Sequence, residues 1–257
     1  MNRINLEELS WKDVEAYLAS DNRIILPVGS TEQHGRFAPL GTDTYVAKAV
    51  AEGAAEQTGV LVAPPLWFGW SPHHLVKPGT ISIRAEVLIE VLGDAIDSLA
   101  RNGFANFVVI NGHRIVNIPW MQIAAERVQR TLGVKVVLFD PAYMSKEIVA
   151  ELGFGSIGHG EEIEISHMRH CHPDLVRLSD AKDNPHEETP LYHLDPQDPR
   201  DTLCYVPATR EGLQRVFDRT GDTITGRPNL ASPEKGKTYH EHLVARLVEV
   251  LEMLKKR

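Results

Sequence analysis

Apolar residues form two kinds of pattern along the chain: short continuous runs, and longer stretches in which they recur every three or four positions. A short run rich in β-branched or aromatic residues indicates a buried strand, and the spaced pattern indicates an amphipathic helix. Strands are therefore predicted at 23–28, 60–64, 107–111 and 134–139, and helices at 11–18, 44–58, 87–102, about 120–132 and 239–256.

These predicted strands and helices alternate along the chain, and Ser10 is expected to cap the first helix. The alternation is typical of a mostly parallel sheet covered by helices on both faces. The fold class is thus predicted as α/β, a single domain over 1–257 with three α/β/α layers. Residues 182–203 are rich in Pro, Asp and His. They are expected to form a long loop of the kind that often serves as a lid or an interface arm.

Composition narrows the function classes. The formal net charge is −8, which argues against nucleic acid or an anionic membrane as partner. No segment reaches the ~18 consecutive apolar residues of a membrane helix, and the first residues lack the apolar core of a secretory signal. Cys171 and Cys204 are the only cysteines, too few for a disulfide framework, so a cytoplasmic location is expected.

A candidate metal-binding segment follows the first strand, in the run Gly29-Ser30-Thr31-Glu32-Gln33-His34-Gly35. Glu32 and His34 are two apart, so in extended chain they project to the same side. Asp43 follows after a loop that can fold back on them. Carboxylate and imidazole together suit Zn, Mn or Fe. One carboxylate can bridge two ions, and paired ions activate water for hydrolysis.

Two later segments carry similar chemistry. The strand at 107–110 ends in Asn111-Gly112-His113, which places a histidine at the carboxyl end of a strand, where α/β sheets bind ligands. In the second segment, glycines flank His159, and several carboxylates follow it, including Glu164.

At these residues the chain resembles the creatininase (creatinine amidohydrolase) family, and the matching blocks keep the order of the family through nearly the whole sequence. The matching blocks are Leu26-Pro27-Val28-Gly29-Ser30-Thr31-Glu32-Gln33-His34-Gly35 with Asp43, Pro78-Gly79-Thr80-Ile81-Ser82, Asn111-Gly112-His113, Gly158-His159-Gly160 with Glu164 and Ser166, Gly221-Asp222, and Pro233-Glu234-Lys235-Gly236.

The resemblance implies a hydrolase with two divalent metal ions per chain. By position, Glu32 and His113 would ligate one ion, His34 the other, and Asp43 would bridge them. Creatininase itself takes a carboxylate ligand from just after the Asn-Gly-His turn, but Ile115 stands there in this chain and cannot bind metal. The resemblance therefore assigns Glu164 as the last ligand. It also implies a homo-oligomer, a ring-like hexamer in characterised relatives.

The same resemblance assigns residues to catalysis and substrate binding. His159 matches a histidine that moves protons near the scissile bond, and His74 matches one that lines the pocket. Arg114 departs from the family pattern. Its guanidinium would suit a carboxylate or phosphate of the substrate, or it points to solvent or pairs with a surface acid. His73 is expected to be exposed.

The other histidines are expected to have no function in the site. Three histidines, at 167, 170 and 172, surround Cys171 at a spacing that could support a metal. The segment continues a helical pattern, however, so these histidines are expected on a solvated face of a helix. The others are expected to be exposed in the loop or on the C-terminal helix. These residues are His167, His170, His172, His186, His193, His240 and His242.

The predicted function is a metal-dependent amidohydrolase that cleaves a C–N bond of a small linear or cyclic amide with a metal-activated water. Two alternatives stay open. A deformylase acting on a phosphorylated pterin or flavin precursor would explain Arg114. A catalytically inactive binding protein of the same fold would explain the altered turn after His113.

Overall fold

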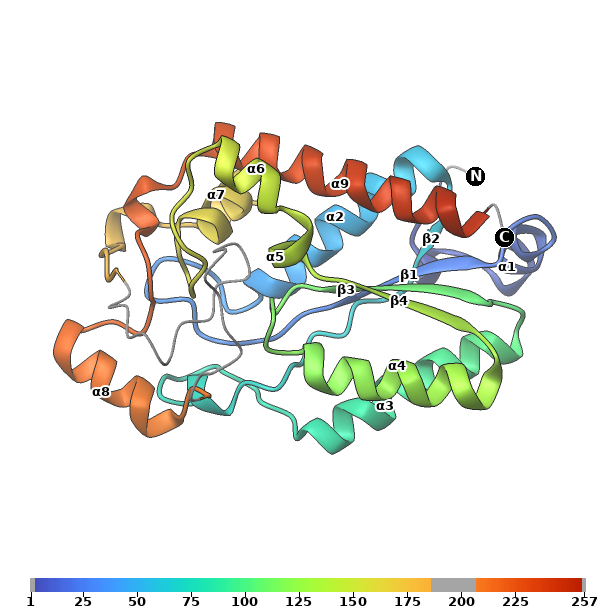
Figure 1. Ribbon diagram of the computed structural model, residues 1–257, viewed down its shortest axis with the longest axis horizontal. Helices are drawn as coiled ribbons and strands as arrows, with labels where there is room; N and C mark the ends of the chain where they lie inside the picture. The colour runs from blue at the N-terminus through green and yellow to red at the C-terminus, as the bar shows by residue number, and fades with distance from the viewer. Residues whose placement is uncertain (1–2, 186–206, 256–257) are drawn as a thin grey trace.

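A four-stranded, fully parallel sheet forms the centre of the computed structural model, which describes residues 3–185 and 207–255 (Figure 1). The strand order is β2-β1-β3-β4. Every residue of β1 is buried, as expected for a central strand covered on both faces. The strands are β1 (Arg23–Val28), β2 (Leu61–Val62), β3 (Asn106–Asn111) and β4 (Lys135–Phe139).

Helices cover both faces of this sheet. Figure 1 shows α2 and α9 on one side, together with α5, α6 and α7, and α3 and α4 on the other. The helices are α1 (Trp11–Leu18), α2 (Thr42–Thr58), α3 (Ala85–Arg101), α4 (Ile118–Leu132), α5 (Pro141–Met144), α6 (Lys146–Glu151), α7 (Glu162–Cys171), α8 (Arg210–Thr220) and α9 (Pro233–Lys255). The predicted three-layer α/β/α architecture is confirmed.

Successive residues of β1 supply the two apolar cores. Ile25 packs into the core beneath α2 and α9, whereas Ile24 and Leu26 pack into the core beneath α3 and α4. This alternation follows from the two-residue period of a strand, which sends neighbouring side chains to opposite faces. A strand buried in this way needs apolar residues at consecutive positions.

The predicted elements agree with the structure to within a few residues, and Ser10 caps α1 in a capping box with Asp13. The second strand is shorter than predicted, and α9 begins six residues earlier, at Pro233. Helices α5, α6 and α8 were not predicted; the first two are too short to show a helical period. Most of the predicted loop at 182–203 lies outside the described residues. Within the described part of the chain, no helix is long and apolar enough to cross a membrane.

The strand order creates a crossover point between β1 and β3. After β1 the chain moves to β2 on one side, and after β2 it crosses to β3 on the other side. Val28 at the end of β1 pairs in register with Asn111 at the end of β3. The loops that leave these two ends diverge, which opens a crevice at the carboxyl edge of the sheet.

Gly112 lets the turn after β3 lie against the first turn of α2. A Cβ at this position would collide with the backbone carbonyl of Asp43. A side chain would therefore push apart the two segments that carry His113 and Asp43, so the site depends on this glycine.

We predict that Gly112→Ala destabilises the protein by about 1–3 kcal/mol, the usual cost of overpacking. Gly93→Ala is the matched control, because Gly93 lies inside α3 with only ordinary contact to Val128. It should stabilise the helix by ~0.5–1 kcal/mol. Urea unfolding measures both variants, and equal stability of Gly112→Ala and the parent would show that the segments are not tightly apposed.

Candidate metal centre

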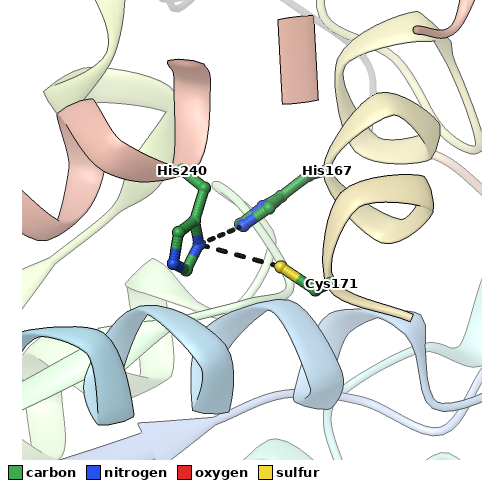
Figure 2. A group of neighbouring side chains, drawn as sticks. All are labelled: His167, Cys171 and His240. Atoms are coloured by element: carbon green, nitrogen blue, oxygen red, sulfur yellow. Dashed lines mark hydrogen bonds between the residues drawn. The ribbon is translucent and has the colours of Figure 1, made fainter. Parts of the chain in front are cut away.

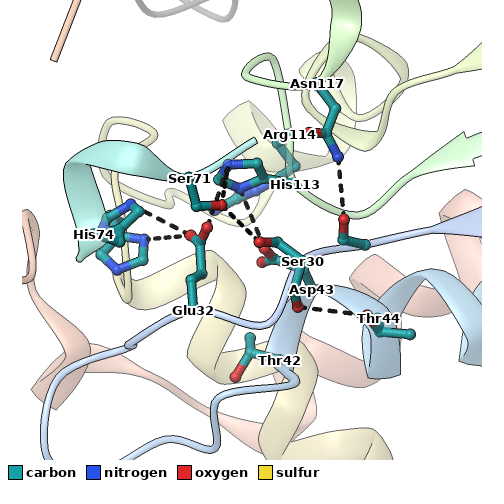
Figure 3. Close-up of polar contacts among 12 residues, drawn as sticks. Ser30, Glu32, Thr42, Asp43, Thr44, Ser71, His74, His113, Arg114 and Asn117 are labelled. Atoms are coloured by element: carbon teal, nitrogen blue, oxygen red, sulfur yellow. Dashed lines mark hydrogen bonds and ion pairs between the residues drawn. The ribbon is translucent and has the colours of Figure 1, made fainter. Parts of the chain in front are cut away.

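Five predicted ligands gather at the carboxyl edge of the sheet, and Figure 3 shows three of them, Glu32, Asp43 and His113. Glu32 and His34 lie in the loop after β1, and Asp43 lies in the first turn of α2. His113 follows β3, and Glu164 belongs to the first turn of α7. All five side chains are buried, although they come from four separate segments.

Asp43 stands between two groups of ligands. Its Oδ1 atom lies 3.2 Å from Nε2 of His34, and its Oδ2 atom lies 3.2 Å from Nδ1 of His113. Nε2 of His34 is also 3.5 Å from Oε2 of Glu164. On the other side, Nε2 of His113 lies 3.3 Å from Oε2 of Glu32. The two oxygens of one carboxylate thus face two different sets of donors, as a bridging ligand requires.

Several ligand atoms of this site find no hydrogen-bond partner in the part of the chain that the structure describes, which suits binding of a divalent cation. Seven buried side-chain nitrogen or oxygen atoms among the described residues have no hydrogen-bond partner, and four belong to Glu32, His34 and Asp43. Buried carboxylates without donors are costly unless a cation compensates them. Nδ1 of His34 donates to the carbonyl of Glu32 at 3.1 Å, which leaves Nε2 as the atom that faces Asp43. This arrangement is typical of metal-binding histidines.

The electrostatics of the site show the same demand for positive charge. Burial lowers the pKa of His34, but Glu164 and Asp43 outweigh burial and raise it well above its usual value. Burial also lowers the pKa of His113, and Glu32 and Asp43 reverse this and raise it to about 9. Histidines that ligate a metal must be neutral, so binding of a cation would be coupled to release of any proton that these carboxylates favour on His34 and His113.

The side chain of Arg114 is only 9% exposed and is paired with buried acids, so the alternative in which it points to solvent or pairs with a surface acid is wrong. Its Nη2 atom lies 2.6 Å from Oε1 of Glu161 and 3.1 Å from Oε1 of Glu164. Glu161 also caps α7 by accepting from the backbone N–H groups of Ile163 and Glu164. Glu161 was not singled out in the sequence. Its position just before a helical pattern could have identified it as a helix-capping residue. Arg114 thus fixes the carboxylate of Glu164.

His74 and His159 lie on the other side of Glu32, and Gln33 holds both of them. Nε2 of His159 donates to the carbonyl of Gln33 at 2.6 Å, so Nδ1 is free to accept and lies 3.5 Å from Oε1 of Glu32. The side-chain amide of Gln33 donates to Nδ1 of His74 at 2.7 Å, and Nε2 of His74 faces Glu32 at 3.3 Å. The hydroxyl of Thr223 in turn donates to Oε1 of Gln33. Gln33 was part of the sequence motif but had been given no role.

The turn that carries His113 is held by Asp140, which sequence reasoning missed. Asp140 Oδ2 accepts from the side-chain amide of Asn111 and from the backbone of Ile115, both at 2.8 Å. Oδ1 accepts from the backbone of Ala142 at 2.8 Å, which caps α5. Ile115 has φ 68°, and among the described non-glycine residues only it has positive φ. These bonds hold a β-branched residue in a conformation that it rarely adopts.

A cavity of about 240 Å³ opens above the ligands. Glu32, Asp43, His113 and Glu164 form its polar floor, and His74, Arg114 and His159 also line it. The remaining wall is largely apolar and includes Ile115, Val116, Ile157, Ala208 and Leu213. Its size suits a small molecule.

Three expectations about histidines need correction. His73 is not exposed but buried beside His74. His167 is also buried, so it does not lie on a solvated helix face, and the half-buried Cys171, His170 and His172 are only partly solvated. His240 and His242 are half-buried on α9. His186 and His193 lie outside the described residues. The errors share a cause, because other segments cover faces that the local pattern leaves open.

Comparison with known proteins identifies the family of this chain. The family model described as creatininase, creatinine amidohydrolase, matches residues 7–251. The chain belongs to the creatininase family. It is a hydrolase of this family with candidate metal sites.

Relatives of this creatininase-family chain differ in the reactions that their names describe. It is 34% identical to creatinine amidohydrolase of Pseudomonas putida over 84% of this chain and 90% of that protein. It is 29% identical to 3-dehydro-scyllo-inosose hydrolase of Thermotoga maritima over 94% of this chain and 80% of that protein. Mycofactocin precursor peptide peptidase of Mycolicibacterium smegmatis is 43% identical over 35% of this chain and 38% of that protein.

Solved structures of creatininase share the fold along the whole chain. A mutant creatininase described as Zn–Zn type has a TM-score of 0.77, and a creatininase described as the Mn form has 0.76. Both are 28% identical and cover 100% of both chains. Zinc and manganese are therefore the metals found in these two relatives.

We predict that Asp140→Ala lowers the free energy of unfolding by about 2–4 kcal/mol, because buried N–H groups of Asn111 and Ile115 lose their acceptor. Asp97→Ala is the control, since Asp97 pairs with the exposed Arg101 within α3. It should change stability by no more than ~0.5 kcal/mol. Chemical denaturation measures both, and equal effects would mean that Asp140 does not hold the turn.

Proposed function

We propose that this hydrolase binds two divalent metal ions and cleaves the C–N bond of a small linear or cyclic amide with a metal-activated water. The observation that carries the proposal is the position of Asp43, whose two oxygens face His34 and His113 at 3.2 Å each. Glu32 and His113 would hold one ion, and His34 and Glu164 the other, with Asp43 between them. Zn, Mn and Fe all suit these nitrogen and oxygen donors.

Such ions, when bound, would lower the pKa of a coordinated water toward neutrality and polarise the carbonyl of the amide. His159 is the proposed proton carrier. Nε2 of His159 donates to the carbonyl of Gln33, so Nδ1 carries the lone pair and is the atom that would accept a proton. His159 would take a proton from the attacking water as the water oxygen bonds to the carbonyl carbon, and would pass that proton to the nitrogen that leaves when the C–N bond breaks.

Residues around His159 position it and the substrate. Gln33 fixes the orientation of both His159 and His74 through the bonds described above. We propose that His74 contacts the substrate from the cavity wall. Glu164, which we assign both as a ligand and as part of the catalytic group, is oriented by Arg114. The apolar wall of the cavity would limit access of bulk water to the reacting carbonyl.

The pairing of Arg114 supports an amide without an anionic group. Two carboxylates, Glu161 and Glu164, already compensate its charge. A phosphorylated pterin or flavin precursor would need that charge, so the deformylase alternative loses the feature that favoured it. We propose that Arg114 affects substrate binding mainly by orienting Glu164. Only the N–H groups of Arg114 that do not pair with Glu161 and Glu164 could contact the substrate directly.

The first prediction concerns metal content. Glu164→Ala should contain about one metal ion per chain less than the parent, because its carboxylate completes the second set of ligands. Glu162→Ala is the matched control: Glu162 is also a buried glutamate at the start of α7, but it pairs with Lys235. Elemental analysis of the purified proteins makes the comparison. Unchanged metal content in Glu164→Ala would remove Glu164 from the ligand set.

A second prediction concerns proton transfer. His159→Ala should lower kcat by ~10²–10⁴-fold, the usual contribution of a general acid–base group, with metal content unchanged. A panel of cyclic amides, linear amides, short peptides and formamides identifies the substrate, and His242→Ala on α9 is the control. A parent that binds two ions at this centre but hydrolyses no member of the panel would favour the inactive binding protein. Full activity of His159→Ala would assign proton transfer to another group.

A further inference from the structure

A second cluster of metal-ligating side chains lies away from the centre described above (Figure 2). His167 and Cys171 are four residues apart and so lie on one face of α7. His240 approaches them from α9, as Figure 2 shows. The two helices pack closely here, since a Cβ at Gly236 of α9 would collide with the carbonyl of Ser166 on α7. Three donors from two helices are therefore brought together by backbone packing.

The separations in this cluster match those between ligands of one metal ion. Nε2 of His167 lies 3.0 Å from Nδ1 of His240, and Sγ of Cys171 lies 3.7 Å from the same nitrogen. All three atoms lie within 4.8 Å of one another. With Zn–N bonds of ~2.0–2.1 Å and a Zn–S bond of ~2.3 Å, tetrahedral ligand atoms lie about 3.3–3.6 Å apart. Only small side-chain movements would thus be needed for all three to ligate one ion.

We propose that His167, Cys171 and His240 form an additional site for one zinc-type divalent cation, separate from the centre around Asp43. Two imidazoles and a thiolate are donors typical of zinc sites. Water would take the fourth position, because Cys171 and His240 are half-buried and leave an approach to the site. The cation would join α7 to α9, and α7 carries Glu164 in its first turn. It would therefore stabilise the helix that supplies a ligand to the main centre.

The competing explanation is a cluster held only by hydrogen bonds. His167 and His240 can share one proton between Nε2 and Nδ1, which accounts for their contact without a metal. Burial lowers the pKa of His167 well below its usual value and that of His240 to about 4, so both rings are neutral, as metal binding requires. Burial raises the pKa of the Cys171 thiol to about 12, and a bound cation would have to displace that proton. The thiol of Cys171 can also donate to Nδ1 of His240 at 3.7 Å (Figure 2), so hydrogen bonding accounts for the contacts of all three side chains and only a metal-binding test separates the two explanations.

Cobalt distinguishes the two explanations, because Co²⁺ bound to a thiolate gives a near-ultraviolet charge-transfer band and the main centre contains no cysteine. The full-length protein is stripped with a chelator and titrated with Co²⁺. We expect the band to appear, to be lost in Cys171→Ser, and to persist in Cys204→Ser, which removes the only other cysteine of the chain. A parent without the band, or a Cys171→Ser variant that keeps it, would overturn the proposal.

Metal content provides an independent test on zinc-supplemented protein that has not been stripped. Cys171→Ser and His240→Ala should each contain about one ion per chain less than the parent, and zinc should raise the melting temperature of the parent more than theirs. His242→Ala is the matched control, because His242 is also half-buried on α9 but contacts the carbonyl of Met144. Equal metal content in the parent, Cys171→Ser and His240→Ala would refute the site. The metal content of Cys171→Ser and His240→Ala tests the additional site, and that of Glu164→Ala tests the centre around Asp43. Either proposal can therefore fail while the other holds.

Discussion

Buried negative charge is the constraint on which the rest of this structure depends. Glu32, Asp43 and Glu164 are buried close to one another at the base of the cavity. Carboxylates in such a place cost several kcal/mol each unless positive charge compensates them. Arg114 compensates part of this charge by pairing with Glu164. The oxygens of Glu32 and one oxygen of Asp43 are left without hydrogen-bond donors, and they define the space that a cation would fill.

Other parts of the protein keep these charged groups close to one another. The crossover between β1 and β3 opens the crevice, and Gly112 lets the turn after β3 contact the start of α2. Asp140 then holds the turn through its bonds to Asn111 and Ile115. None of these features touches the cavity floor, yet each one fixes the position of a ligand. Positioning of this kind is expected around a metal centre, where the orientation of each ligand sets its affinity.

Arg114 shows how a departure from a family pattern can be misread from sequence. A guanidinium beside a metal centre suggests an anionic substrate, and that interpretation depends on the charge being unpaired. In the folded protein Glu161 and Glu164 both approach it, from the loop before α7 and from its first turn. The same residue then supports Glu164 and leaves little charge for a substrate. Whether Arg114 binds an anionic substrate or supports Glu164 depends on contacts between distant parts of the chain, which only the folded structure shows.

The sequence by itself determined the α/β class and the order of the main strands and helices, because burial on both faces of a strand and on one face of a helix leaves a local pattern. The resemblance to the family came from short motifs that keep their order along the chain. The sequence also contained every predicted ligand in short motifs such as Glu32 and His34. Only the tertiary structure decided that Asp43 faces two donor sets, that His73 and His167 are buried, and that His167, Cys171 and His240 meet. These facts depend on packing between α7, α9 and the ends of the strands, and contacts between residues far apart in sequence leave no local pattern from which they could be read.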